Sequence, residues 1–375
     1  MTNPRSLLLG ATAIWGLAAT AAWAERPIVY SLFTTSTHQD SVYTIPRMEE
    51  ELKTLTNGEI TFDIHYGGVL ANATTVTKAI ADGTVDGGMI FYPYTPSLVP
   101  VNDLLAELPG RDARVSAAAV TETQMLDCPD CKAELDAAGL TVLATSASDP
   151  YRLFCGAKKI TSLEDAKGAK LRATSWAAQI GSEIGMTPVN VSYTEIYESM
   201  QRGVVDCFAL STSTVDSAKL FEVTKYAYPD LNFGDSHGFT YLALNKRMWD
   251  GFSPEIQQAF MQVAPGVIAD NVRIGQENAA AAFETLIPDN KIEIVETSPD
   301  LVEAVDASFA NLRSSAIERA NERGVKNAEE IASAYDENVE KWTAIVAEIG
   351  EGEWGDAEWT AYRDRLASEI YANLP

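Results

Sequence analysis

Histidines and recognisable catalytic motifs are scarce in this sequence. Only His38, His65 and His237 occur among its 375 residues, and they lie far apart. The chain has no GxSxG, no HExxH and no phosphate-cradling glycine loop, and its 53 acidic residues single out no catalytic pair. We therefore predict that the protein is not an enzyme, that it has no cofactor and that no residue set forms a metal site; the sequence leaves open whether a metal ion assists ligand binding.

Basic residues are also few. The chain has 28 Lys and Arg against 53 Asp and Glu, which gives a net charge of −25. Such a surface repels nucleic acid and anionic lipid, so neither is expected as a partner. An anionic ligand must be held by local positive groups against this field, which makes each arginine near a pocket informative.

Long apolar runs are absent except near the N-terminus. Arg5 precedes an apolar stretch over residues 7–19, and small residues stand at Ala22 and Ala24. We interpret residues 1–24 as a secretory signal peptide cleaved after Ala24, which makes the mature protein periplasmic, with a net charge of −26 once Arg5 is lost. No other segment reaches 18 uninterrupted apolar residues, so we expect no direct membrane insertion.

Four cysteines in an exported chain favour disulfides over free thiols, and three pairings are possible. We favour Cys128 with Cys131, because a CxxC closes locally, and Cys155 with Cys207, because both lie in strand-like runs. A thioredoxin-like redox site is the alternative interpretation of CPDC, but no thioredoxin-like pattern surrounds it. A structural zinc site lacks its second ligand pair.

Short apolar strands alternate with helical patterns between Ile28 and Thr240, which predicts an α/β fold with largely parallel sheets. Residues 79–91 and 199–211 share one order of helix end, glycine, Val-Asp and strand. Generic helix-to-strand chemistry can produce this order, but its recurrence supports two lobes of similar construction.

About 350 mature residues suffice for two domains. Residues 141–155 contain two extended segments around an Asp-Pro break, as expected of a strand that crosses between lobes, and residues 236–245 resemble its return. The predicted organisation is a signal peptide (1–24), lobe I (25–146, with a return of about 237–290), lobe II (147–236, with about 291–330) and C-terminal helices packed on the lobes (331–375).

Ligands of open α/β sheets bind beyond the carboxyl ends of the strands. In a protein with two lobes, these strand ends would face the cleft between the lobes. Arg172 ends a strand-like run directly before a helix start. Its guanidinium offers a planar fork for a carboxylate, and the helix N-terminus adds backbone donors. The alternative is a surface arginine paired with one of the many acids.

Other candidates follow from position at strand ends. Arg152 ends the proposed crossing strand, and His38 lies in the first loop, where it is either a polar contact or a bystander. Tyr92, Tyr94, Trp176 and Phe233 either form the wall of an apolar ligand or belong to the core.

The segment SLEDAKGAKLRATSWAAQIGSEIGMTPVNVSYTEIYESMQRGVVD (162–206) resembles the central signature of the solute-binding proteins of tripartite ATP-independent periplasmic (TRAP) transporters, the DctP-like family. The matched features include the Lys-Leu-Arg strand and Gly185 with Pro188. The IHYGGVL and AIADGTVDGG segments fit the family too, so the resemblance covers most of the mature chain.

This resemblance implies a two-lobed receptor that closes over a small organic acid, has a long helix spanning both lobes, and docks on a TRAP membrane permease. Arg172 would hold the substrate carboxylate, with Arg152 assisting. Many relatives carry an amide side chain shortly after the Val-Asp, where it contacts the substrate. This chain has CFALSTS there, so Leu210 stands in place of the amide, or Ser211 replaces its contact. Trp176 and Phe208 then indicate a more apolar or aromatic acid.

The predicted substrate-binding residues are Arg172, Arg152, Trp176, Tyr92, His38, Ser211, Phe208 and Phe233. A carboxylate joining Arg172 to Tyr92 or His38 in the other lobe would favour the closed form. A receptor for a signalling pathway and a periplasmic enzyme on the same scaffold are the rival interpretations.

Overall fold

The computed structural model describes residues 27–374, and the predicted signal peptide lies outside the described residues. Two six-stranded sheets form the framework. The first contains β1 (Ile28–Ser31), β2 (Phe62–His65), β3 (Gly87–Phe91), β4 (Leu140–Val142), β5 (Thr145–Ser146) and β11 (Phe239–Asn245). The second contains β6 (Tyr151–Cys155), β7 (Lys170–Arg172), β8 (Thr187–Val189), β9 (Cys207–Ser211), β10 (Tyr226–Asn232) and β12 (Glu293–Ile294).

Both sheets combine a parallel part with a strand of opposite direction. The first has the order β2-β1-β3-β11-β4. Strand β1 is parallel to both of its neighbours, β2 and β3, whereas β11 is antiparallel to β3. The second has the order β12-β10-β6-β9-β7-β8. Strand β7 is parallel to both of its neighbours, β8 and β9, whereas β6 is antiparallel to β9. Each sheet has its own buried apolar cluster, so the prediction of a two-lobed α/β fold is confirmed.

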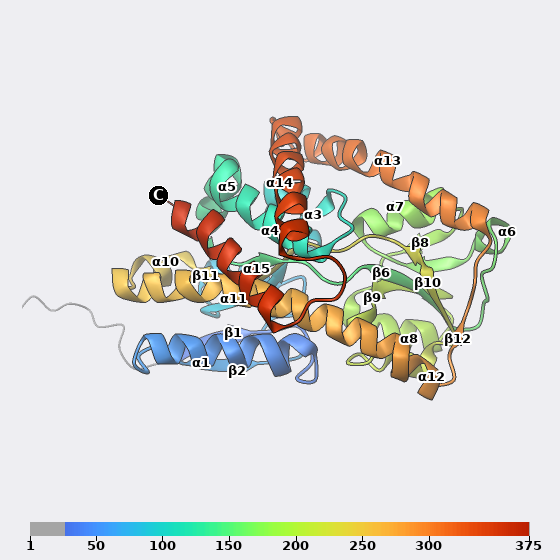
Figure 1. Ribbon diagram of the computed structural model, residues 1–375, viewed down its shortest axis with the longest axis horizontal. Coiled ribbons are helices and arrows are strands. Elements are labelled where there is room, and N and C mark those ends of the chain that lie inside the picture. Colours follow the sequence, from blue (N-terminus) through green and yellow to red (C-terminus); the bar gives the residue numbers. More distant parts are fainter. Residues whose placement is uncertain (1–26, 375) are drawn as a thin grey trace, which may run out of the picture.

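Helices cover both sheets and continue beyond them (Figure 1). Those near the first sheet are α1 (Ile45–Leu55), α2 (Val76–Asp82), α3 (Pro100–Glu107), α4 (Ala113–Glu122), α5 (Pro129–Ala138) and α10 (Lys246–Asp250). Those near the second are α6 (Leu163–Ala166), α7 (Ser175–Glu183), α8 (Ile196–Gln201), α9 (Thr212–Val215) and α12 (Ile287–Asp289).

Two long helices join the lobes. Helix α11 (Pro254–Ala281) starts at Ser253, whose side chain accepts a hydrogen bond from the Ile256 N–H, and runs from lobe I toward lobe II (Figure 1). Directly after it, Ala282 belongs to the core of lobe II, although we expected it in lobe I. Helix α13 (Pro299–Glu322) contributes residues to both cores. A helical pattern does not show where a helix leaves one core and enters the next.

The repeated sequence motif has the same structural role in each lobe. Gly83 and Gly203 have positive φ values of 76° and 67°, which the left-handed turn after α2 and α8 requires. The carboxylates of Asp86 and Asp206 then accept backbone hydrogen bonds near the start of the neighbouring strands, from Val29 of β1 (2.9 Å) and from Lys170 of β7 (2.8 Å). Each aspartate thus ties the start of one parallel strand to the next.

The crossing segments lie side by side between the sheets. The backbone N–H of Ser148 donates to the carbonyl of Ser236 (2.8 Å), and that of Tyr151 donates to the carbonyl of Gly234 (2.7 Å). Residues 147–150 and 233–238 therefore form a paired connection between the lobes, as expected from the two extended sequence segments.

The C-terminal helices α14 (Ala328–Ile349) and α15 (Asp356–Glu369) pack on lobe I. Trp342 is buried, and its indole N–H donates to the carboxylate of Glu122 (2.6 Å) on α4. Trp354 and Trp359 contact each other edge to face and lie in or against the lobe I core. These contacts fix the C-terminal region to one lobe.

The disulfide prediction is confirmed. Cys128 bonds to Cys131 at the start of α5, and Cys155 bonds to Cys207. Cys155 and Cys207 stand directly opposite each other in the antiparallel pairing of β6 and β9. The residues that the structure describes include no free cysteine.

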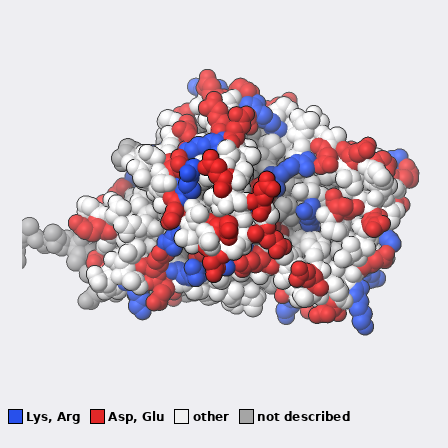
Figure 2. Space-filling view, viewed as in Figure 1, with Lys and Arg blue, Asp and Glu red and all other residues white. Residues whose placement is uncertain are grey.

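The surface agrees with the acidic composition. Figure 2 shows acidic side chains spread over the visible face, with basic ones interspersed among them. Within residues 27–374, no helix has the length and apolar character needed to cross a bilayer.

Two carboxyl groups are buried where α13 packs on α3. Asp103 is fully buried beside Glu107, and both carboxylates accept hydrogen bonds from Arg323. Burial raises the pKa of Asp103 to about 8; the charge of Glu107 acts in the same direction, and the charges of Arg323 and Arg319 oppose both.

We expect the protein to be more stable at pH 6 than at pH 8. The folded chain retains the Asp103 proton up to about pH 8, whereas the unfolded chain loses it near the ordinary pKa of 3.8, so stability falls as the pH rises through this window. Below pH 8 this group contributes a slope of about 1 kcal/mol per pH unit. Thermal unfolding at pH 6, 7 and 8 measures it, and Asp103→Asn should flatten the dependence. Equal slopes in parent and variant would contradict this origin.

Candidate ligand-binding site

A cavity lies between the lobes, and the space outside the protein atoms is about 570 Å³ there, including solvent at its open side. Residues of both sheets, of the crossing segments and of α11 line it. The apolar and aromatic lining residues are Phe33, Met89, Phe91, Tyr94, Tyr151, Tyr193, Leu210, Phe239 and Tyr241. The other lining residues are Thr34, His38, Gln39, Asp40, Ser148, Arg172, Thr174, Ser211, Thr214 and Asn271.

Arg172 is the last residue of β7, and its side chain is only 2% exposed. Its Nε donates to the carbonyl of Val191 (2.9 Å), which fixes the plane of the guanidinium. Within residues 27–374, no carboxylate forms an ion pair with it. A buried charge without a partner is unfavourable, so this guanidinium is suited to receive an anion from outside the chain.

The guanidinium also contacts the other lobe. Its Nη2 lies 3.4 Å from the hydroxyl of Tyr94, which belongs to the short helix η2 (Tyr92–Tyr94) directly after β3. The free edge of Arg172 therefore faces a cavity whose opposite wall is provided by lobe I.

Two hydroxyl groups of the cavity lining are buried without hydrogen-bond partners in the described part of the chain. One is Thr34 Oγ1 in lobe I, and the other is the hydroxyl of Tyr193 in lobe II. Burial raises the pKa of Tyr193 to about 12, which keeps its hydroxyl protonated and able to donate. Nine buried side-chain polar atoms of the described residues lack a hydrogen-bond partner, and these two line the cavity.

Aromatic and aliphatic side chains form much of the remaining wall. Phe91 stacks on Phe239 with ring centroids 4.3 Å apart, and Tyr94 packs edge to face against Phe91 at 5.2 Å. Met89 and Leu210 also line the cavity. This wall suits the apolar body of a ligand.

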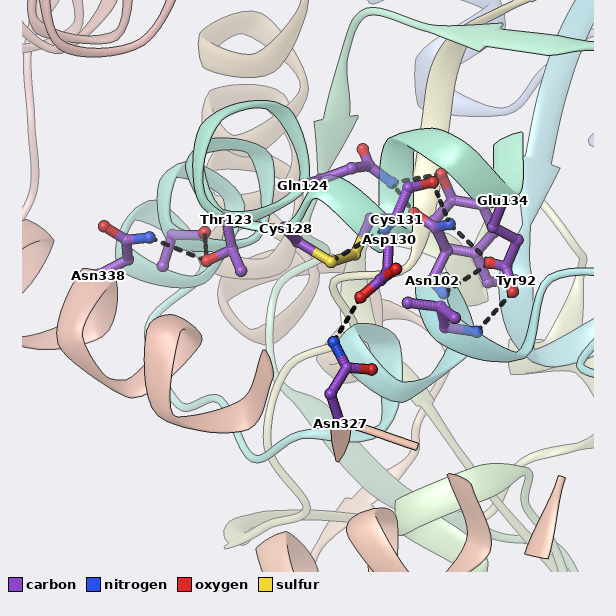
Figure 3. Close-up of a disulfide and its surroundings, with 12 residues drawn as sticks. Tyr92, Asn102, Thr123, Gln124, Cys128, Asp130, Cys131, Glu134, Asn327 and Asn338 are labelled. Carbon is purple, nitrogen blue, oxygen red and sulfur yellow. Dashed lines mark hydrogen bonds between the residues drawn. A yellow bond between two sulfur atoms is a disulfide. The ribbon is translucent and has the colours of Figure 1, made fainter. Parts of the chain in front are cut away.

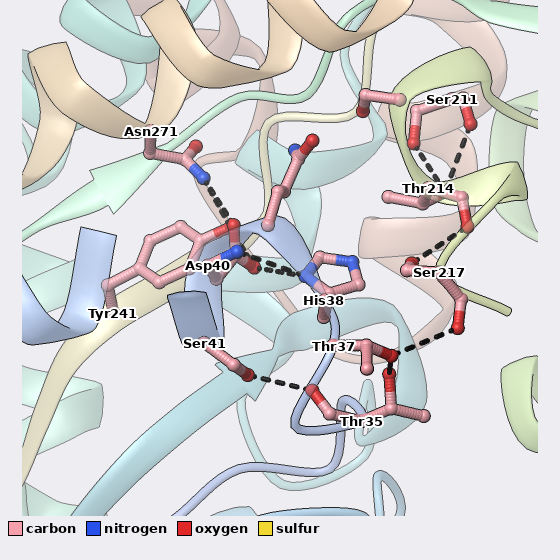
Figure 4. Close-up of polar contacts among 12 residues, drawn as sticks. Thr35, Thr37, His38, Asp40, Ser41, Ser211, Thr214, Ser217, Tyr241 and Asn271 are labelled. Carbon is pink, nitrogen blue, oxygen red and sulfur yellow. Dashed lines mark hydrogen bonds and ion pairs between the residues drawn. The ribbon is translucent and has the colours of Figure 1, made fainter. Parts of the chain in front are cut away.

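A second polar group of the lining surrounds Asp40 (Figure 4). Its carboxylate accepts hydrogen bonds from the amide of Asn271 (2.9 Å) and the hydroxyl of Tyr241 (3.1 Å). His38 Nδ1 lies 3.1 Å from the same carboxylate. Nearby, Ser211 and Thr214 hydroxyls are 2.9 Å apart.

The structure places Arg172, His38 and Ser211 of the predicted site in the cavity lining. Leu210, at the position where relatives were expected to carry an amide, lines it as well. No cluster of three or more metal-ligating side chains occurs among the described residues.

Tyr92 and Trp176 lie outside the lining. The Tyr92 hydroxyl accepts a hydrogen bond from the amide of Gln124 (2.7 Å) inside lobe I, close to the Cys128–Cys131 disulfide (Figure 3). Trp176 is buried, and its indole N–H donates to the carbonyl of Phe233 (2.8 Å). Both side chains are buried in the core and do not line the cavity.

Phe208, Phe233 and Arg152 also lie outside the lining. Phe208 stacks on Phe154 in the core of lobe II, and Phe233 is fully buried in that core. Arg152 alternates with Tyr151 along β6, so its side chain is on the opposite face of the sheet from this lining residue. Burial lowers the pKa of Arg152, and the charge of Asp149 opposes this.

Several lining residues were not among the individually predicted binding residues. Thr34, Asp40 and Tyr193 lie in loops or short turns after strands, where the position at a strand end was an available signal. Asn271 is in the middle of α11, and nothing in its local pattern sets it apart from a polar residue on an exposed helix face.

A cavity enclosed by two α/β lobes and crossing strands is the architecture of a two-lobed solute-binding protein. The family model of the bacterial extracellular solute-binding proteins, family 7 (DctP), matches residues 34–319. The chain belongs to this family.

Two relatives are each 28% identical to this chain over the residues that align. The 2,3-diketo-L-gulonate-binding periplasmic protein YiaO of Escherichia coli is 28% identical over 259 residues, which are 67% of this chain and 76% of that protein. The C4-dicarboxylate-binding periplasmic protein DctP of Rhodobacter capsulatus is 28% identical over 129 residues, covering 33% of this chain and 37% of that protein.

Solved structures of TRAP solute-binding proteins have the same fold. One from Rhodoferax ferrireducens in complex with copurified benzoate gives a TM-score of 0.74 at 19% identity and covers 86% of this chain and 99% of its own. One from a marine metagenome, specific for aromatic acid ligands and crystallised with 3-hydroxybenzoate, gives 0.74 at 21% identity, with 85% and 99% covered.

Proposed function

We propose that this protein is a periplasmic receptor for a small organic acid, whose carboxylate binds Arg172 and whose body packs against the apolar wall of the cavity. The observation that carries the proposal is the buried guanidinium without a carboxylate partner, facing the cavity beside the unpaired hydroxyls of Thr34 and Tyr193. A carboxylate can accept hydrogen bonds from all three groups.

The apolar wall indicates the kind of body that the acid has. Phe91 and Phe239, stacked on each other, and Tyr94, which packs edge to face against Phe91, form an aromatic wall next to Arg172. An aromatic or otherwise apolar acid would bury more of its surface here than a polyhydroxylated sugar acid. Aromatic acids bound to two proteins of the same fold agree with this choice.

Ligand binding would favour closure of the lobes. Arg172 belongs to lobe II, whereas Thr34 and Tyr94 belong to lobe I. A ligand that contacts all three gains its full binding energy only when the lobes are together, so it shifts the population toward the closed form. The closed receptor would deliver the acid to a TRAP membrane permease and would not convert it chemically.

A panel of acids tests this proposal. Residues 25–375 are unfolded and refolded to remove carried-over ligand, and thermal shifts are recorded with aliphatic, hydroxy, keto, sugar and aromatic carboxylates. A ligand that binds only the native state raises the melting temperature. We expect aromatic or apolar monocarboxylates to give the largest shifts. If no carboxylate raises the melting temperature, the proposal is wrong, and recovery of a chemically altered ligand would favour the enzyme alternative.

We expect Tyr193→Phe to weaken binding of the acid by about tenfold without lowering the stability of the ligand-free protein. Apart from a weak interaction with Ser217, the hydroxyl has no partner among residues 27–374, so removing it loses little internal hydrogen bonding but removes a donor from the cavity. Calorimetric titration and thermal unfolding measure the two effects.

Tyr92→Phe is the matched control. It removes the hydroxyl that accepts a hydrogen bond from Gln124, so it should lower stability by about 1 kcal/mol and leave binding unchanged. The reverse pattern, with binding weakened by Tyr92→Phe and unaffected by Tyr193→Phe, would contradict a ligand position beside Tyr193.

A further inference from the structure

Asp40 is a buried carboxylate inside the same cavity, at the start of the π-helical turn η1 (Asp40–Thr44) that precedes α1. It is 1% exposed. Among the described lining residues it is the only acid, and Arg172 is the only Lys or Arg. The cavity therefore contains one negative group, Asp40 of lobe I, and one positive group, Arg172 of lobe II.

The position of this carboxylate is fixed from several elements. The Asn271 amide donates to Oδ1 (2.9 Å) and the Tyr241 hydroxyl to Oδ2 (3.1 Å), while Ser146 Oγ donates to the amide oxygen of Asn271 (2.8 Å). His38 Nδ1 lies 3.1 Å from Oδ2. An ionised carboxylate accepts about four hydrogen bonds, so these partners leave Oδ1 able to accept another.

A carboxylate held this firmly discriminates between substituents of a ligand. A hydroxyl or N–H on the ligand can donate to Asp40 and gain a charge-assisted hydrogen bond. A second carboxylate on the ligand would instead face a like charge in a cavity largely closed to water, where repulsion is strong. A ligand with an unsubstituted apolar body should bind more weakly than the hydroxyl- or N–H-bearing ligand and more tightly than the dicarboxylate.

We propose that Asp40 is a specificity-determining residue: it accepts a hydrogen bond from a hydroxyl or N–H group on the body of a monocarboxylate, and it excludes dicarboxylates. This inference rests on the proposed function, because it assumes that Arg172 holds the first carboxylate. The substrate class is then a hydroxy- or amino-substituted monocarboxylic acid with an apolar or aromatic body.

Two sets of ligands that differ in one substituent test the proposal by calorimetric titration. One is benzoate, 3-hydroxybenzoate and isophthalate, and the other is butyrate, 4-hydroxybutyrate and glutarate. In each set a hydrogen atom is replaced by a hydroxyl group or by a second carboxylate. For the parent protein, in the set that it binds, we expect the hydroxy acid to bind about tenfold more tightly than the unsubstituted acid, and the dicarboxylate to bind at least about tenfold more weakly.

Asp40→Asn removes the charge and keeps the shape. We expect the affinity for the hydroxy acid divided by the affinity for the dicarboxylate to fall by at least about tenfold in this variant. The main cause would be tighter binding of the dicarboxylate. Asp63→Asn is the matched control, because it changes the net charge equally at a side chain that is 58% exposed on β2, and it should leave the ratio unchanged.

The outcomes separate this inference from the proposed function. If the parent binds these acids through Arg172 but prefers the dicarboxylate, or if Asp40→Asn leaves the ratio within twofold of the parent value, the role of Asp40 is wrong and the receptor function stands. If the parent binds no carboxylate, both are wrong. The ranking of ligands by the parent alone decides the matter if the variant does not fold.

Discussion

Arg172→Ala is expected to weaken binding of the organic acid by about a hundred- to a thousandfold. The side chain is 2% exposed and faces the cavity, and loss of a buried, charge-assisted contact to a carboxylate removes about 3–4 kcal/mol. The ligand-free variant should have about the stability of the parent, because removal of a buried charge that no acid of residues 27–374 neutralises offsets the lost packing and the lost hydrogen bond to Val191. Calorimetric titration and thermal unfolding of refolded protein measure both quantities.

Two further variants make the test of Arg172 specific. Arg152→Ala removes an arginine from the neighbouring part of the same sheet, outside the cavity lining, and should leave affinity within about threefold. Arg172→Lys keeps the charge but loses the planar fork, so its affinity should be intermediate. If Arg152→Ala weakens binding as much as Arg172→Ala does, the effect comes from general charge and not from a direct contact.

Replacing both Cys155 and Cys207 by alanine should lower the free energy of unfolding by about 4 kcal/mol. The bond closes a loop with a sequence separation of 52 and joins β6 to β9 at the centre of the lobe II sheet. A crosslink restricts the unfolded chain more when the closed loop is longer, and this length gives about 4 kcal/mol in the chain-entropy model.

The other disulfide provides the control. Cys128 and Cys131 are separated by only 3 positions, for which the same model gives about 1.6 kcal/mol. Denaturant unfolding of the two double-alanine variants, purified and measured under identical conditions, gives the comparison. Equal losses of stability would show that the restriction of the unfolded chain is not the main contribution.

Much of the architecture was predictable because it depends on local patterns. The repeated Gly-x-Val-Asp order marks the same helix-to-strand turn twice, and the carboxylates of Asp86 and Asp206 then join equivalent strands. Arg172 could be chosen from its place at the end of β7, directly before a helix. In each case a single stretch of sequence predicts both the secondary-structure element and the position of the residue within it.

The remaining lining residues depend on contacts between distant segments. Trp176 and Phe208 were reasonable candidates for an aromatic wall, but the buried hydrogen bond from Trp176 and the stacking of Phe208 place both in the core. The rings that line the cavity instead include Phe91 and Phe239, which meet through the antiparallel pairing of β3 and β11. Strand pairing across about 150 residues cannot be deduced from either segment alone.

The acidic surface has a consequence for delivery and uptake. With a net charge of −25, the protein repels anionic acids at long range, so capture depends on the local field of Arg172 inside the cavity. In the proposed receptor, the single guanidinium would therefore be both the anchor of the ligand and the main source of attraction for it.

A crystal structure of the protein carrying a bound organic acid tests the central claim most directly. We predict that the ligand carboxylate lies within about 3 Å of the Arg172 guanidinium, with the body of the ligand against Phe91 and Phe239. A ligand bound elsewhere, or bound in this cavity with its carboxylate away from Arg172, would contradict the account.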